Sequence, residues 1–147
     1  MPISIIIAIL CVIVAYMAFL VMRPKDVRIC FVGPHSTGKT VSLLSLLGLD
    51  NKTVTTLASH RVIYKNKEIF ELVPDESNRD FVDKYQLNPN DKFVFFVKNE
   101  EEIDSFPDCS GFDIVFVMWK KTKDKKRKDL IYLDESREKL KDLILKM

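Results

Sequence analysis

The sequence predicts an α/β domain with a mostly parallel sheet and an antiparallel edge strand, preceded by one apolar helix. Three observations support this fold class. Residues 3–22 carry no charge, although the chain has 23 basic and 21 acidic side chains in 147 residues. Apolar runs at 27–32, 92–97 and 112–119 have the near-continuous pattern of parallel strands covered on both faces. The runs at 60–65 and 68–73 have the spacing of an antiparallel hairpin.

The N-terminal stretch 3–22, ISIIIAILCVIVAYMAFLVM, predicts a transmembrane helix. About 20 helical residues span about 30 Å, the thickness of the hydrocarbon core of a bilayer. A cleaved signal peptide is the alternative, but such peptides have a basic start, a shorter apolar core and small residues at the cleavage site. Arg23, Lys25 and Arg28 follow the stretch, and basic flanks stay in the cytosol. We therefore expect a lumenal N-terminus and a cytosolic domain at 23–147.

A glycine-rich motif, GPHSTGKT at 33–40, follows the first strand-like run and precedes the helix-like VSLLSLLG. A strand, GxxxxGK[ST] and a helix in this order form a phosphate-binding loop, or P-loop. In such a loop Lys39 reaches the β- and γ-phosphates of a nucleotide, and the Thr40 hydroxyl binds Mg²⁺. The alternative is a structural turn before a helix. The lysine, the threonine and the expected cytosolic location favour nucleotide binding.

The remaining elements complete the domain. We expect Asn66-Lys67 to connect the hairpin, Gly48 to end the helix after the P-loop, and 129–133 to form a last short strand. Ser136 should cap a terminal helix whose apolar stripe is Leu140, Leu143 and Ile144. The connections between the later strands are close to the minimum length for a helical crossover. Peripheral helices should therefore be reduced or missing.

This order of features resembles the Ras-like GTPase superfamily, and within it the family of signal recognition particle receptor β subunits. Three stretches carry the resemblance: the span with GPHSTGKT, then TVTT followed by RVIYKN, and then LVPDES. Members of that family have an N-terminal membrane span followed almost directly by an Arf-like GTPase domain. The threonine-rich stretch is switch I in that family, and the last stretch is switch II. The resemblance covers most of the chain, and the P-loop is its specific motif.

The resemblance implies a GTP-binding regulatory subunit that uses Mg²⁺ and spans the endoplasmic reticulum membrane once. Such a subunit recruits the receptor α subunit for cotranslational protein targeting, with the ribosome or the translocon as further partners. Thr40 and Thr55 are the implied metal ligands. The residues assigned to nucleotide binding are those of the P-loop, the next residue and one lysine near the base: Gly33, Pro34, His35, Ser36, Thr37, Gly38, Lys39, Thr40, Val41 and Lys121.

Switch II departs from the pattern of the family. The expected aspartate falls near Glu71 or Val73, and the expected glycine falls near Pro74 or Asp75. A proline has no backbone N–H with which to contact a γ-phosphate. No glutamine stands nearby to position a water molecule. We therefore leave the catalytic residues unassigned and expect at most a slow GTPase.

The guanine-recognition motif also departs. Where Asn-Lys-x-Asp should follow the strand that ends at Trp119, the chain reads WKKTKD. Lys121 is our candidate to cover the base, and Asp124 is a candidate partner for the guanine edge. Guanine preference is thus implied by the resemblance alone. Two alternatives stay open: an Arf- or Sar-like trafficking GTPase, although those proteins use reversible anchors, and a P-loop ATPase or kinase of unknown substrate.

Charge and cysteine content limit other functions. A net charge of +2 argues against direct DNA binding by the whole domain. The basic run 120–128 is interpreted as a solvated loop, or as a contact with anionic lipid or with RNA; the nearby anchor favours lipid over RNA. Cys11, Cys30 and Cys109 lack the spacing of a disulfide framework or a zinc site, so we expect free thiols.

Overall fold

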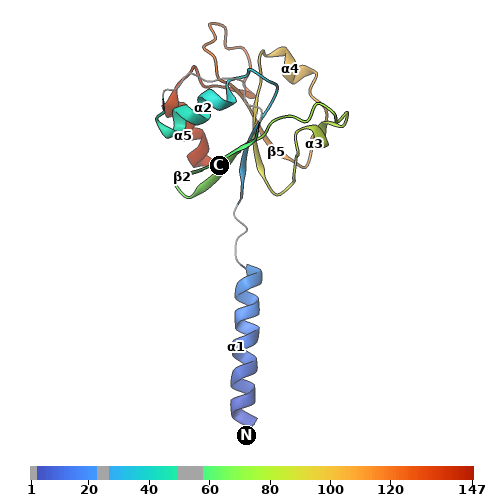
Figure 1. The fold of residues 1–147 in the computed structure, drawn as a ribbon, viewed down its shortest axis with the longest axis vertical. Helices are drawn as coiled ribbons and strands as arrows, with labels where there is room; N and C mark the ends of the chain where they lie inside the picture. Colours follow the sequence, from blue (N-terminus) through green and yellow to red (C-terminus); the bar gives the residue numbers. More distant parts are fainter. Residues whose placement is uncertain (1–2, 23–26, 50–57) are drawn as a thin grey trace.

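The computed structural model describes residues 3–22, 27–49 and 58–147, which form one apolar helix and an α/β domain (Figure 1). The helices are α1 (Ile3–Met22), α2 (Lys39–Leu47), α3 (Phe81–Lys84), α4 (Glu101–Asp104) and α5 (Arg137–Lys146). The strands are β1 (Ile29–Val32), β2 (His60–Tyr64), β3 (Lys67–Glu71), β4 (Lys92–Phe96), β5 (Asp113–Met118) and β6 (Leu130–Tyr132).

The six strands form one sheet in the order β2-β3-β1-β4-β5-β6. Only β2 is antiparallel to its neighbour, so the predicted mostly parallel sheet with an antiparallel edge strand is confirmed. The five parallel strands all end at one edge, called here the carboxyl edge, and begin at the opposite amino edge. The chain passes from β1 to β3 on one side and to β4 on the other. Parallel sheets bind ligands at such a switch point, beyond the carboxyl ends of the strands.

Helices cover both faces of the sheet, which makes three layers (Figure 1). On one face, α2 and α5 pack on the sheet through Leu43, Leu46, Leu140, Leu143 and Ile144, all buried. The Ser136 hydroxyl accepts a hydrogen bond from the backbone N–H of Lys139, so the predicted cap and apolar stripe of α5 are confirmed. Gly48 ends α2 as expected.

Among the described residues, the helices on the other face are the single-turn α3 and α4, which confirms that the peripheral helices are reduced. Aromatic side chains supply much of the missing cover. Phe81, Tyr85, Phe95, Phe106 and Phe116 form a chain of ring contacts with centroids 4.7–6.0 Å apart. Large rings bury much apolar area per residue, so a short chain can still close this face of the core.

Two local expectations are corrected. The hairpin turn is Lys65–Asn66, not Asn66-Lys67, and both turn residues have positive φ, as a two-residue hairpin with the twist of its strands requires. The strand predicted at 112–119 is fully buried only towards its end, because its first residue, Asp113, is exposed and Ile114, Val115 and Phe116 are half-buried. This strand lies next to the three-residue edge strand β6, which shields less of it.

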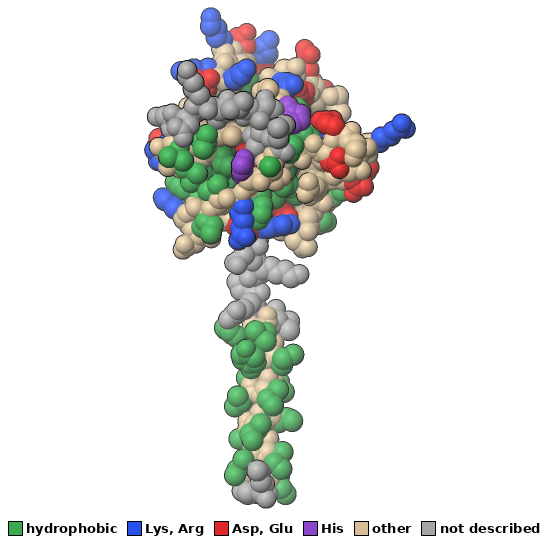
Figure 2. Space-filling view, in the orientation of Figure 1, with side chains coloured by type: hydrophobic (Ala, Val, Ile, Leu, Met, Phe, Trp, Pro, Cys, Tyr) green, Lys and Arg blue, Asp and Glu red, His purple; other side chains and the backbone are tan. Residues whose placement is uncertain are grey.

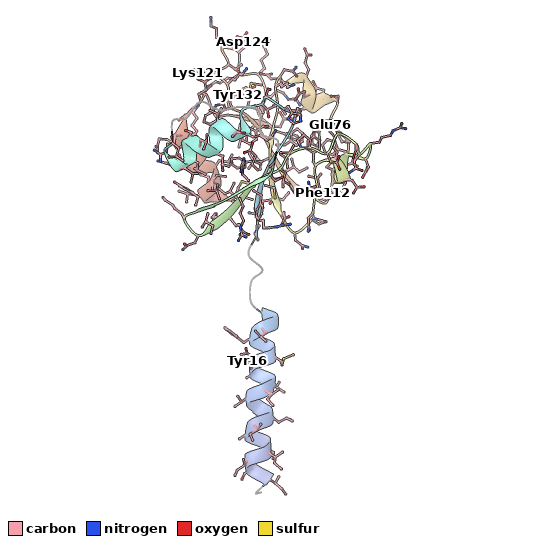
Figure 3. All side chains as sticks on the ribbon, viewed as in Figure 1. Tyr16, Glu76, Phe112, Lys121, Asp124 and Tyr132 are labelled. Carbon is pink, nitrogen blue, oxygen red and sulfur yellow. The ribbon has the colours of Figure 1, made fainter. Side chains whose placement is uncertain are left out.

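The basic run 120–128 leaves β5 at the carboxyl edge, whereas the chain enters the domain from α1 at the amino edge. Figure 3 shows Lys121 and Asp124 at the end of the domain farthest from α1. This placement argues against the alternative interpretation of the run as a contact with lipid headgroups. Two of its basic residues are also engaged within the domain, since Lys125 pairs with Asp134 and Arg127 pairs with Asp104 and Asp129.

Helix α1 is apolar along its whole length, and its described side chains are exposed. The window Ile3–Leu20 has a mean hydropathy of 3.0 and none of it is buried in the domain. A helix of this length and composition near an N-terminus fits either a membrane anchor or a signal sequence.

Candidate functional site

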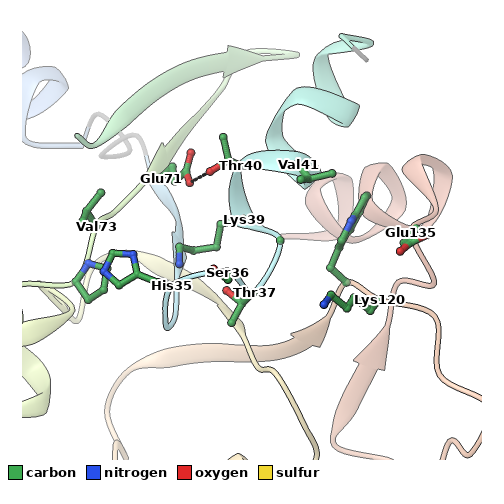
Figure 4. Close-up of a pocket in the computed structure, with 13 residues that line it drawn as sticks. His35, Ser36, Thr37, Lys39, Thr40, Val41, Glu71, Val73, Lys120 and Glu135 are labelled. Atoms are coloured by element: carbon green, nitrogen blue, oxygen red, sulfur yellow. Dashed lines mark hydrogen bonds between the residues drawn. The ribbon is translucent and has the colours of Figure 1, made fainter. Parts of the chain in front are cut away.

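The P-loop connects β1 to α2 at the carboxyl edge and lines a cavity of about 350 Å³ (Figure 4). Gly33 leaves β1 with φ +134°, and a Cβ at this position would lie 2.4 Å from the Phe96 carbonyl oxygen. Gly38 precedes α2 with φ +94°, and no side chain caps the helix. Only glycine fits at both positions. The first N–H groups of α2 thus open towards the cavity, where an anion is stabilised by the helix dipole.

Lys39 is the cation of this site, and it is buried. Its ammonium donates to the carbonyl oxygens of Gly33 at 2.7 Å and Pro34 at 2.6 Å. Burial lowers the pKa of Lys39 from 10.5 to about 8, and the repulsion from Lys98 adds to this, while the Glu71 carboxylate opposes it. A buried cation with so little water around it interacts strongly with an incoming phosphate. The lysine is therefore positioned to neutralise a polyphosphate.

The Thr40 hydroxyl donates a hydrogen bond to Oε1 of Glu71, at the end of β3 (Figure 4). Glu71 is 1% exposed. A hydroxyl and a carboxylate oxygen are hard donors of the kind that Mg²⁺ prefers, and Mg²⁺ usually takes one or two carboxylates together with substrate phosphates and water. No group of three or more His, Cys, Asp or Glu side chains gathers in the parts of the chain that the structure describes. The donor set fits a nucleotide-bound Mg²⁺ rather than an all-protein metal site.

The other end of the cavity is formed by the loops after β5 and β6. Trp119 and Lys120 follow β5, and Glu135 follows β6. The Glu135 backbone N–H donates to the Trp119 carbonyl oxygen at 2.7 Å, which ties the two loops together. Trp119 is 6% exposed and packs on Gly38, so the indole joins this end of the cavity to the P-loop.

Most residues predicted to bind nucleotide line this cavity, namely His35, Ser36, Thr37, Gly38, Lys39, Thr40 and Val41. Gly33 and Pro34 do not line it; they shape the loop and accept the hydrogen bonds of Lys39. Lys121 and Asp124 are exposed and lie outside the lining, where Lys120 takes the place expected for Lys121. Thr55, the expected switch I ligand, lies outside the described residues, as does the whole TVTT stretch.

The stretch expected to form switch II also lies beside the cavity. Glu71, Val73 and Pro74 line it, in the order expected for the aspartate, an intervening residue and the glycine of that motif. Asp75 does not; its carboxylate accepts hydrogen bonds from Ser77, which lower the pKa of Asp75.

Sequence reasoning missed Trp119, Lys120 and Glu135 as lining residues. The pattern that could have found them is positional: each follows a strand parallel to β1, and the carboxyl ends of parallel strands meet at one edge. The position of an Asn-Lys-x-Asp motif instead predicts base contacts further along the chain, at Lys121 and Asp124.

The geometry therefore combines a cradle of backbone N–H groups, a buried lysine, a hydroxyl–carboxylate pair and an aromatic residue in one cavity. A scan against protein-family models matched no family, and a search of curated proteins found no match.

Proposed function

We propose that this chain is a membrane-anchored GTP-binding regulatory subunit of the signal recognition particle receptor type. In this role the domain faces the cytosol at the endoplasmic reticulum membrane and recruits a receptor α subunit when GTP is bound, close to the ribosome or the translocon. The observation that carries the proposal is the contact of Thr40 with Glu71 beside the buried Lys39, at the switch point of the sheet. These three groups are the phosphate and Mg²⁺ partners that a P-loop NTPase requires.

The role proposed for each residue of the site follows from the chemistry of its polar groups. The P-loop N–H groups and Lys39 would hold the phosphates, and Thr40 with Glu71 would hold Mg²⁺, directly or through water. Glu71 then takes the role of the switch II aspartate. The mostly parallel sheet with an antiparallel β2 agrees with the Ras-like architecture that the resemblance implies. A lasting anchor at α1 disfavours an Arf- or Sar-like protein, because those proteins attach reversibly.

A second candidate is a P-loop NTPase without guanine preference, such as an ATPase. The observation that favours it is the composition of the base end of the cavity. Trp119, Lys120 and Glu135 stand there, and none of them is the asparagine or aspartate of a guanine motif. A tryptophan face stacks on any purine, so it does not by itself select guanine.

Nucleotide competition on the full-length protein in nanodiscs tests the proposal. A fluorescent GTP analogue would be displaced by GTP, ATP and xanthosine triphosphate in parallel titrations. We expect GTP to compete best; equal competition by ATP would favour the second candidate. Lys39→Ala should abolish binding and leave membrane insertion intact, and Lys123→Ala, the same change on an exposed lysine, should leave both intact. Normal affinity in Lys39→Ala would refute the P-loop assignment.

The membrane topology is tested separately. Alkaline carbonate should fail to extract the protein from microsomes, and protease added outside sealed microsomes should digest the domain. Extraction by carbonate, or protection of the domain, would refute a single span with a lumenal N-terminus.

A further inference from the structure

Val27, where the chain enters the amino edge of the domain, stays close to the end of α1. Met22 ends α1 and Val27 is the next described residue, five Cα–Cα steps later. At about 3.6 Å for each step, the two residues stay within about 18 Å of one another. Since β1 begins at Ile29, the amino edge faces the bilayer if α1 spans it.

This edge presents apolar side chains to solvent. Val27 is 46% exposed, Ile63 in β2 is 67% exposed, and Leu145 in the last turn of α5 is 45% exposed. Val27 and Ile63 line a second hollow of about 450 Å³, together with Met147. The last turn of α5 is held there by Lys67, whose ammonium donates to the Ile144 carbonyl oxygen at 3.0 Å. The hairpin, the start of β1 and the end of α5 thus meet at the amino edge, with Ile63 on one side of the sheet and Leu145 on the side of α5.

Basic side chains surround these apolar ones. Arg61 and Lys65 lie in and after β2, and Lys146 ends α5; all three are exposed. The neighbouring acidic groups are matched by basic ones: Glu68 pairs with Arg61, the buried Asp91 pairs with Arg28, and Asp113 lies 3.9 Å from Lys92. Glu138 of α5, which Lys65 also attracts, pairs with Lys141. Lys65 and Lys146 therefore leave an excess of positive charge. Figure 2 shows basic and hydrophobic side chains together on the end of the domain that faces α1.

We propose that this amino-edge surface, formed by Val27, Arg61, Ile63, Lys65, Leu145 and Lys146, rests on the anionic headgroups of the membrane that α1 spans. A surface that combines exposed aliphatic side chains with lysine and arginine is the kind that binds at an anionic interface. The short connection at 23–26 keeps the surface within reach. The proposal rests on α1 being a membrane anchor, but on no property of the nucleotide site.

The consequence is a fixed orientation. With the amino edge on the membrane, the carboxyl edge, with the P-loop, switch II and the run 120–128, faces away from the bilayer. A soluble partner could then reach the nucleotide-dependent surface without competing with lipid.

Acetylation footprinting tests this on the full-length protein. The chain would be reconstituted in nanodiscs of phosphatidylcholine alone, or of phosphatidylcholine with phosphatidylserine, and lysine acetylation would be followed by mass spectrometry. We expect Lys65 and Lys146 to react several-fold more slowly in the anionic discs, while Lys123 and Lys126 at the opposite edge react equally in both. Equal rates for Lys65 in both discs, or the same slowing at Lys123, would overturn the proposal.

Matched variants identify the contact. Lys65→Glu should reduce the protection of Lys146 in anionic discs by about fivefold or more, since one basic residue near an anionic surface contributes about 1 kcal/mol. Ile63→Ser should reduce it as well, and Lys123→Glu should not. An effect of Lys123→Glu equal to that of Lys65→Glu would contradict the assigned surface. A chain that does not enter the discs at all would disprove the anchor instead, so the two failures are distinguishable.

Discussion

The indole of Trp119 lies directly against Gly38. A Cβ built on Gly38 would be 2.7 Å from Cδ1 of Trp119, closer than real side chains approach. A side chain at position 38 would therefore clash with the indole, and the glycine lets the loop pack against the ring. Trp119 also lines the cavity and accepts the backbone hydrogen bond of Glu135. Through its indole and its backbone carbonyl, Trp119 thus connects the Gly38 end of the cavity to the loop at Glu135.

Trp119 should accordingly report nucleotide binding through its fluorescence. It is the single tryptophan of the chain, so the emission has one source. We expect a shift in intensity or wavelength when nucleotide and Mg²⁺ are added, because the ring environment in the cavity changes. The titration should saturate at the same concentration as an independent binding assay. A response that persists in Lys39→Ala would show that the signal does not come from the P-loop.

Lys39 should take up a proton when a polyphosphate binds above pH 8. Its pKa in the nucleotide-free site is about 8, because burial disfavours the charged form. Phosphate charges favour the ammonium form, so binding raises this pKa and takes a proton from solution. Calorimetry at pH 8.5 in buffers of different ionisation enthalpy should show net uptake. Affinity should fall as the pH rises through 8, and Lys39→Met should abolish the uptake.

The same pKa also has a consequence for stability. In the unfolded chain the pKa of lysine is near 10.5, so between about pH 8 and 10.5 the unfolded state binds more protons than the folded one. The contribution of Lys39 to the free energy of unfolding therefore increases with pH across this window. Denaturant titrations of the parent protein and of Lys39→Met, compared at pH 7.5 and 10, should show the penalty of the buried charge in the parent at the lower pH.

Glu71→Gln should weaken the part of nucleotide affinity that depends on Mg²⁺. The carboxylate accepts the Thr40 hydrogen bond and is placed to hold a metal-bound water. Loss of such an outer partner typically costs 10- to 100-fold in metal affinity. We expect a loss of about that size in Mg²⁺, and little change with EDTA present. An equal loss in both conditions would indicate a structural role for Glu71 instead.

Gly33→Ala should destabilise the domain. The new Cβ would lie 2.4 Å from the Phe96 carbonyl oxygen, on the backbone of a central strand, and φ would stay at +134°. We expect a loss of at least about 2 kcal/mol in the free energy of unfolding, given about 1–3 kcal/mol for backbone strain alone. Gly111→Ala is the matched control, since Gly111 has φ +105° and open space around its Cβ. Equal losses in the two variants would mean that the contact with β4 contributes nothing.

The architecture could be predicted from the sequence because it depends on local patterns. Each apolar run indicates a strand, the GPHSTGKT motif indicates a loop before a helix, and the Ser136 cap indicates the start of a helix. The structure places these elements within a residue or two of their predicted positions. The hairpin turn was predicted one residue too late. Sequence preference assigns the positive φ values to Asn66 and Lys67, whereas in the structure Lys65 and Asn66 adopt them. The strand order in the structure shows at which edge of the sheet the motifs meet.

The base end of the cavity could not be predicted in the same way. Trp119 and Glu135 are 16 positions apart and meet only because β5 and β6 are neighbours in the sheet. A sequence motif is recognised by particular residue types at a fixed spacing, and neither Trp119 nor Glu135 belongs to the guanine motif. The Thr40–Glu71 contact spans 31 positions and depends on the register of β3 against β1. The sequence suggested Glu71 and Val73 as candidates for the position of the switch II aspartate. In the structure it is Glu71 that contacts Thr40.

The last prediction concerns hydrolysis, which should be very slow or absent in the isolated protein. Phosphoryl transfer depends on positioning and charge stabilisation rather than on a strong nucleophile, so a missing contact is not replaced by other chemistry. In the proposed function, Lys39, Thr40 and Glu71 would provide contacts for the phosphates and Mg²⁺. Pro74, however, lines the cavity where a glycine N–H would contact the γ-phosphate, and a proline has no N–H to offer.

Neither chain neighbour of Pro74 supplies the missing function. Val73, its neighbour in the cavity lining, is apolar, and Asp75 directs its carboxylate to Ser77. A bound γ-phosphate would still select one conformation of the switches, which is sufficient to present a surface to a partner. Single-turnover hydrolysis by the full-length protein should therefore not exceed about 10⁻⁴ per second, the rate of an unassisted small GTPase. Pro74→Gly should leave nucleotide affinity equal or higher. A parent rate well above this limit would mean that another group positions the attacking water, and that the nucleotide is consumed rather than held.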